Sequence, residues 1–107
     1  MSKTREETTV GADGWVLFKV AGSSKVSAVA GAIVKTMDEG KKVALLAIGA
    51  GAVNQSMKAI ASARTMAAGA GKNLYCIPSF QDEKFGGEPG AAKTALRFSI
   101  YDLSKIL

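Results

Sequence analysis

Residues 49–58 contain the groups in this sequence that are best suited to holding a ligand. A glycine turn, Gly49-Ala-Gly51, follows an apolar run and precedes a segment with helical spacing. A helix beginning there leaves unpaired N–H groups and a partial positive charge at its N-terminus, which favours a phosphate. Asn54, Gln55 and Lys58 follow on one stripe of that helix, and short amides beside a lysine suit contacts to phosphate and sugar. The competing interpretation is an ordinary strand-to-helix turn followed by a solvated helix face.

The glycine turn does not match a dinucleotide-binding site. Asn54 stands where the third glycine of the G-x-G-x-x-G pattern belongs, and no acidic residue ends the next expected strand, residues 74–80. The chain also carries no acidic residue from Gly49 through Lys72. A helix face that serves solubility alone usually mixes both charges, so this composition favours an anionic ligand at the turn.

Catalysis is not expected from these residue types. The sequence has no histidine, which removes the common triads and histidine acid–base chemistry. Cys76 lies between apolar neighbours in an expected strand, which is typical of a buried, inert thiol. One cysteine forms no intrachain disulfide and assembles no metal site by itself. The sequence therefore predicts no catalytic residue, no metal, no cofactor and no small-molecule substrate.

Charge and hydropathy narrow the class of partner. The 107 residues suffice for one domain, and 14 Lys+Arg against 9 Asp+Glu give a net charge of +5. That excess is compatible with a polyanionic partner such as nucleic acid. No apolar run approaches the roughly 18 residues of a membrane span, and residues 1–9 lack the apolar core of a signal peptide. We expect a reduced, cytoplasmic protein without a membrane partner.

A small α/β domain must position the candidate site. Residues 1–14 are polar and predict a flexible N-terminal arm, whereas residues 15–107 predict a single domain. Hydrophobic periodicity predicts the order β-α-β-α-β-β, with a long loop over 81–93. We expect a two-layer α+β sandwich, a four-stranded mixed sheet with both helices on one face. The strands are expected at 15–20, 43–48, 74–80 and 94–102, and the helices at 25–39 and 52–68.

Alternation along the strands predicts the two faces of that sheet. Val16, Phe18 and Val20 suit the helix-covered face, and the other face carries Trp15, Leu17, Arg97 and Tyr101. Pro78 indicates an edge strand or an irregularity, because proline donates no backbone hydrogen bond. Arg64 projects from the apolar side of its helix and is expected to be structural. The core-facing residues of the second helix are expected to be Val53, Met57, Ile60, Ala63 and Ala67.

Three segments resemble one known family, the stage V sporulation protein S family. They are the run from Ala47 to Arg64 (AIGAGAVNQSMKAIASAR), the helical run from Val26 to Ile33 (VSAVAGAI) and the strand from Thr94 to Ile100 (TALRFSI). The family is similar to the Alba-type chromatin and RNA-binding proteins. The resemblance spans residues 15–102 and implies an Alba-like fold, a homodimer, and nucleic-acid binding linked to sporulation or developmental regulation.

The resemblance also implies where nucleic acid would bind. Alba-type proteins use lysines before the first helix, the glycine turn before the second helix and a β-hairpin arm. In this sequence, those places are held by Lys25, by residues 49–58 and by the loop around Lys84. The implied contact residues are Lys25, Gly49, Gly51, Asn54, Gln55, Lys58 and Lys84.

Two functional hypotheses follow, and the sequence does not choose between RNA and DNA. The first is a dimeric regulator that binds RNA or DNA through its sugar–phosphate backbone. The second is a protein-interaction or assembly module whose alanine-rich surfaces and Trp15/Tyr101 face mediate association without nucleic acid. An enzyme or phospholigand receptor would require a defined small-molecule pocket.

Overall fold

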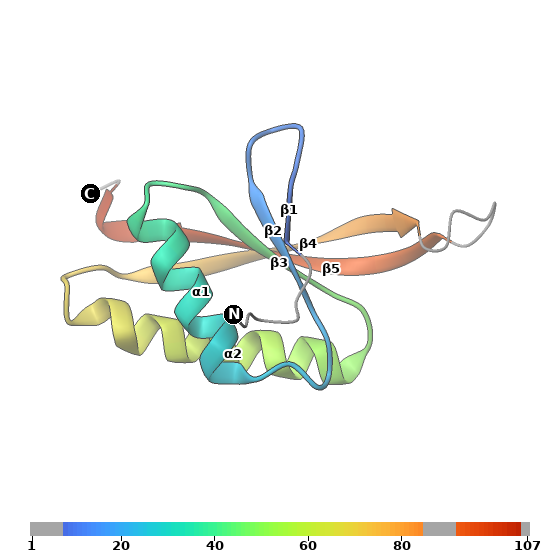
Figure 1. Cartoon of the computed structure of the whole chain (residues 1–107), viewed down its shortest axis with the longest axis horizontal. Helices are drawn as coiled ribbons and strands as arrows, with labels where there is room; N and C mark the ends of the chain where they lie inside the picture. The colour runs from blue at the N-terminus through green and yellow to red at the C-terminus, as the bar shows by residue number, and fades with distance from the viewer. Residues whose placement is uncertain (1–7, 85–91, 106–107) are drawn as a thin grey trace.

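The protein folds into a mixed five-stranded sheet with two helices on one face (Figure 1). The computed structural model describes residues 8–84 and 92–105, with the side chains at 83, 84, 92 and 93 left out. The expected two-layer α+β architecture is confirmed. In chain order the elements are β1 (Thr8–Val10), β2 (Val16–Val20), α1 (Val26–Asp38), β3 (Val43–Ala47), α2 (Ala50–Ala68), β4 (Leu74–Lys84), β5 (Ala92–Asp102) and the short 3-10 helix Leu103–Lys105.

The strands follow the spatial order β1-β2-β3-β5-β4. The crossover through α1 makes β2 and β3 parallel, with Val16 opposite Val43. The chain then passes through α2 to β4 at the far edge, and β5 returns antiparallel between β4 and β3. Pro78 therefore lies on an edge strand, and that prediction is confirmed.

The predicted number of strands was wrong by one. Thr8–Val10 were assigned to the flexible arm, but they pair antiparallel with β2, with Thr9 opposite Leu17. Two backbone bonds close the turn between the strands, from the Gly11 N–H to the Trp15 carbonyl at 2.8 Å and from the Gly14 N–H to the Gly11 carbonyl at 2.9 Å. A three-residue strand between charged and glycine-rich segments leaves no alternation long enough to detect.

Alternate residues of the strands form two separate apolar layers. The main core lies between the sheet and the helices and includes Val16, Phe18 and Val20, as predicted. A smaller layer lies on the opposite face, where Trp15 packs on three buried side chains. Those three are Leu17, Ala44 and Leu46.

Helix α2 turns a face of small residues inward. Ile60, Ala63 and Ala67 are buried as predicted, but Met57 is 39% exposed, so its core assignment was wrong. The reason is that α2 packs extensively against α1 as well as the sheet, and alanine and serine allow two helices to approach closely. Ser56 is fully buried in α2, and its Oγ has no hydrogen-bond partner among the described residues. The remaining buried residues of α2 are Ala52 and Ala59.

Candidate nucleic-acid interface

The loops that precede the two helices touch each other through glycine. The backbones at Gly22, before α1, and Gly51, in the first turn of α2, approach so closely that a Cβ on Gly51 would lie 3.4 Å from the Gly22 Cα. Gly49, the N-cap of α2, has φ 92° and ψ 158°, a conformation that is essentially restricted to glycine. The glycines therefore bring the loop before α1 against the first turn of α2.

Gln55 fastens these two loops together. Its Nε2 donates to the Ser24 carbonyl at 2.8 Å, a bond between residues 31 positions apart. Ser24 is itself buried, and its Oγ accepts the Ala21 N–H at 2.9 Å. The Asn54 amide donates to Gln55 Oε1 at 3.3 Å. The Gln55 side chain is thus already engaged by its own protein, and its role is to position the neighbouring groups.

In the described structure, no side chain caps the N-terminus of either helix. The N-caps are Lys25 for α1 and Gly49 for α2, and no side-chain capping bond is made at either position in the described structure. Neither first turn contains an acidic residue. The unpaired N–H groups and positive dipole ends of both helices thus lie on either side of the contact between the loop before α1 and the first two turns of α2.

We call this region the helix-end site. It consists of Lys25, Gly49, Gly51, Asn54, Gln55 and Lys58. The arrangement supplies backbone N–H donors, amides and lysines, which is the chemistry of an anion-binding surface. The glycine turn and the stripe through Lys58 are adjacent, as the sequence predicts, because they share the first turns of one helix.

The family of the chain follows from comparison with known proteins. The model of the stage V sporulation protein S family matches residues 16–102. This chain belongs to that family. The matched region runs from the first residue of β2 to the last residue of β5, so it includes the whole helix-end site and omits β1. Membership places the chain among sporulation-related proteins.

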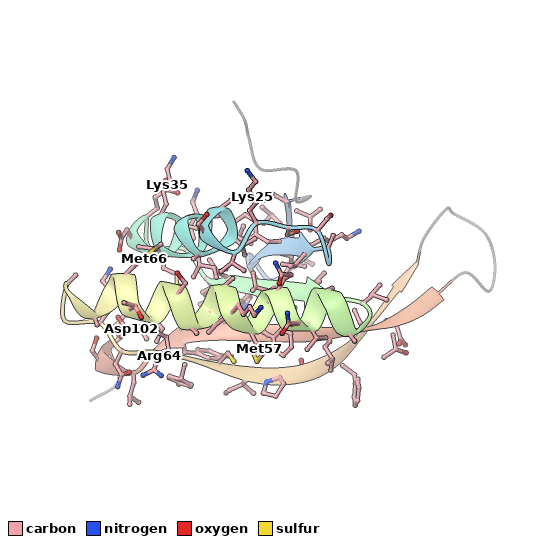
Figure 2. The ribbon with its side chains drawn as sticks, turned by 90° about the horizontal axis from the view of Figure 1, so that it is seen from below. Lys25, Lys35, Met57, Arg64, Met66 and Asp102 are labelled. Carbon is pink, nitrogen blue, oxygen red and sulfur yellow. The ribbon has the colours of Figure 1, made fainter. Side chains whose placement is uncertain are left out.

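The three lysines that are expected to contact nucleic acid, Lys25, Lys58 and Lys84, lie in different surroundings. Asn54 and Lys58 are exposed on α2. Lys25 is exposed too, but Figure 2 shows its side chain extending from α1 on the side away from α2, so it must swing round to reach an anion at the α2 N-terminus. Lys84 ends β4 opposite Ala92, where the β4–β5 ribbon extends beyond the helices in Figure 1. The adjoining loop, 85–91, and the Lys84 side chain lie outside the described residues.

Arg64 is held by the protein itself, as the sequence predicts. Its Nη2 donates to Asn73 Oδ1 at 3.1 Å, which ties α2 to the segment leading into β4. Figure 2 shows Arg64 and Met57 projecting from α2 on the side away from α1. Both line an open groove along α2. Its other lining residues are Ile60, Ala61, Thr65 and Ala68.

The described residues offer little chemistry for nucleophilic catalysis or for metal binding. Burial raises the pKa of the Cys76 thiol, so the group stays protonated at neutral pH and is a poor nucleophile. Within residues 8–84 and 92–105, His, Cys, Asp and Glu side chains form no group that could hold a metal ion. No helix in those ranges is both long and apolar enough to cross a bilayer.

Sequence reasoning missed one cluster that the sheet assembles. It placed Trp15, Arg97 and Tyr101 on the helix-free face, but it did not connect them with Lys42 and Tyr75. Tyr75 stacks on Tyr101, and Lys42 lies over the Trp15 ring. The available signal was the pairing register, which brings residues from four strands into one row once the strand order is known.

Proposed function

We propose that this protein is a non-enzymatic regulator that binds nucleic acid at the helix-end site. The observation that carries the proposal is the contact of the loop before α1 with the first two turns of α2, where neither helix N-terminus is capped by a side chain or accompanied by an acidic residue in its first turn. The Gln55–Ser24 bond holds these termini together without a ligand, so little ordering is required when an anion binds. The net charge of +5 favours a polyanion over a single small anion.

The proposed contacts are made to the sugar–phosphate backbone. The N–H groups of the first turns hold phosphate, Asn54 hydrogen-bonds to phosphate or sugar, and Lys58 neutralises charge along the helix. Lys25 contributes after rotation of its exposed side chain, and Lys84 extends the contact along the β4–β5 ribbon. Contacts of this kind carry little sequence information, so we propose binding with a low sequence preference.

A salt titration tests this function. We expect the affinity for labelled RNA and duplex DNA to fall linearly with salt on a log–log plot, because bound phosphates release counterions. Lys58→Gln should reduce the slope by about 1. Lys35→Gln is the matched control, since Lys35 is an exposed lysine in the last turn of α1 and should leave the slope unchanged. Absence of binding at low salt, or binding that ignores salt, would contradict the proposal.

A homodimer is the second part of the proposed function, and exposed apolar side chains support it. Met57 lines the groove beside α2, and Phe80, on the neighbouring edge strand β4, is 79% exposed. Large apolar side chains that gather next to an open strand edge are typical of a self-association surface.

Sedimentation across a range of protein concentrations tests the dimer. We expect a dimer for the unmodified chain and a shift toward monomer for Phe80→Ser, which removes exposed apolar area without disturbing the core. Val10→Ser is the control, because Val10 is 68% exposed on the opposite edge strand. A monomer at all concentrations would overturn this part and leave the nucleic-acid proposal standing.

A further inference from the structure

A row of three aromatic rings and a lysine crosses the helix-free face of the sheet. The register aligns Val16 with Val43, and Val43 with Ile100, so the preceding Trp15 and Lys42 fall in line with Tyr101. Tyr101 in turn pairs with Tyr75 on β4. The row therefore reads Trp15 and Lys42, which directly precede β2 and β3, followed by Tyr101 on β5 and Tyr75 on β4.

The three rings form one continuous array. The Trp15 and Tyr101 ring centroids are 5.5 Å apart in an edge-to-face arrangement, and those of Tyr75 and Tyr101 are 5.3 Å apart and stacked. All three side chains are half-buried, so each keeps part of its ring in contact with solvent. Trp15 rests on the buried layer formed by Leu17, Ala44 and Leu46, which fixes its position before any ligand arrives.

Cations surround the array. The Arg97 guanidinium lies 5.1 Å and the Lys42 ammonium 5.7 Å from the centre of the Trp15 ring. Arg97 is held in place, because its Nε donates to Ser99 Oγ and its Nη1 to Gln81 Oε1, both at 3.1 Å. Lys19 shares the cross-strand row of Arg97. The Asp13 carboxylate lies 3.9 Å from the Arg97 guanidinium.

We propose that this helix-free face binds single-stranded nucleic acid by stacking unpaired bases on Trp15, Tyr101 and Tyr75. Aromatic rings interleaved with cations on an open sheet face combine base stacking with phosphate neutralisation. The Lys42 contact with Trp15 is exposed and hence weak, so the lysine can move to a phosphate when a base takes its place. A duplex keeps its bases paired and stacked internally, and it gains nothing from these rings.

Charge favours this occupant over an apolar protein surface. Covering the face with a protein would desolvate Lys42 and the Arg97–Asp13 pair, which is costly unless the protein supplies acidic partners. A polyanion with planar bases satisfies both the cations and the rings. The inference rests on the proposed nucleic-acid function and names the form of nucleic acid, but it uses residues that are separate from the helix-end site.

Trp15 fluorescence provides a direct test, because Trp15 is the one tryptophan of the chain. At low salt, oligouridylate and oligodeoxythymidylate should both quench it on binding, since stacking requires bases and not a 2′-hydroxyl. A duplex of mixed sequence should bind without quenching. Quenching of equal size by the duplex, or single-strand binding without quenching, would overturn the stacking proposal. A concentration-dependent change in emission without nucleic acid would also overturn it, by showing that a second copy covers the face.

Two pairs of variants separate stacking from general binding. Tyr75→Ala should lower single-strand affinity by about tenfold or more, whereas Tyr75→Phe should retain it because the ring is kept. Lys42→Gln should reduce the single-strand salt slope by about 1, and Lys41→Gln should not, because Lys41 pairs with Glu39 at 3.3 Å outside the row. Equal affinity of Tyr75→Ala and the unmodified chain would refute the stacking proposal.

The two proposals fail in distinguishable ways. If duplex binds, Lys58→Gln weakens it and Tyr75→Ala changes nothing, the helix-end function stands and the stacking face is refuted. If single strands quench Trp15 and Lys58→Gln has no effect on any nucleic acid, the stacking face stands and the helix-end site is refuted. If neither form binds at low salt, both are refuted.

Discussion

The helix-end site and the helix-free face offer different halves of a nucleotide's chemistry. The helix-end site presents backbone N–H groups, amides and lysines, which suit phosphate and sugar. The helix-free face presents Trp15, Tyr75 and Tyr101, which suit bases. The two surfaces lie at opposite ends of β2 and β3, because the helix-end loops follow these strands, whereas Trp15 and Lys42 precede them. The two proposals thus assign backbone recognition and base recognition to opposite ends and opposite faces of one small sheet.

The largest effect in this comparison is expected from Gly49→Ala. A side chain at φ 92° and ψ 158° is strained, so the substitution should lower the free energy of unfolding by about 1–3 kcal/mol and displace the α2 N-terminus. Chemical denaturation measures the first effect and duplex titration the second. Quenching of Trp15 by single strands should persist. Equal loss of both kinds of binding would show that the two surfaces are not independent.

Gln55→Ala and Asn54→Ala should distinguish a residue that positions the helix-end site from one that contacts nucleic acid there. Gln55→Ala removes the bond to the Ser24 carbonyl and should cost about 1 kcal/mol of stability together with some duplex affinity. Asn54 is exposed, and its side chain donates to Gln55 in the described structure, so Asn54→Ala should lower affinity and leave stability nearly unchanged. Paired denaturation and binding curves check this. A destabilised Asn54→Ala would contradict the assignment.

Acidification should act on the aromatic end of the sheet. The Asp102 carboxylate, next to Tyr101, accepts bonds from Ser104 Oγ at 2.7 Å, the Ser104 N–H at 3.0 Å and the Asn73 N–H at 3.1 Å. The Ser104 hydroxyl, followed by the two backbone donors, holds the pKa of Asp102 below its ordinary value of 3.8. Because the folded pKa is lowered, Asp102 stabilises the fold above about pH 3.8 and loses that contribution as the pH falls further.

Denaturation of the unmodified chain and Asp102→Asn over this range provides the check. The stability of the unmodified chain should fall between pH 4 and pH 2 more steeply than that of Asp102→Asn, which lacks the titrating group. Parallel curves for the two proteins would show that the hydrogen bonds around Asp102 stabilise its charged and neutral forms equally.

The smallest effect is expected from Ser56→Ala, which serves as a reference for both surfaces. The Ser56 hydroxyl is buried without a partner in the described structure, so its removal should be neutral or raise stability by at most about 1 kcal/mol. Binding at the helix-end site and at the helix-free face should be unchanged. A marked loss of stability on thermal or chemical unfolding would indicate that the hydroxyl makes a bond in solution.

Contiguous features of this fold were predictable from the sequence, and dispersed ones were not. The turn at Gly49 and the stripe through Lys58 lie within one short segment, so periodicity sufficed. The array of Trp15, Tyr101 and Tyr75 depends on β5 inserting between β3 and β4, which alternation within single strands does not specify. Met57 was misplaced for a related reason. In an alanine-rich helix, the neighbouring helix decides which side is buried, and periodicity alone does not supply that neighbour.

β1 shortens one of the two edges of the sheet. Its three residues pair with Val16–Phe18 of β2, whereas β4 at the other edge runs for 11 residues with no strand beside it in the described structure. A short edge strand offers few unpaired N–H and C=O groups to another chain, and a long one offers many. Thr8–Val10 thus make their side of the sheet a poor template for strand addition, and a chain without them would present the five-residue strand β2 as the edge in their place.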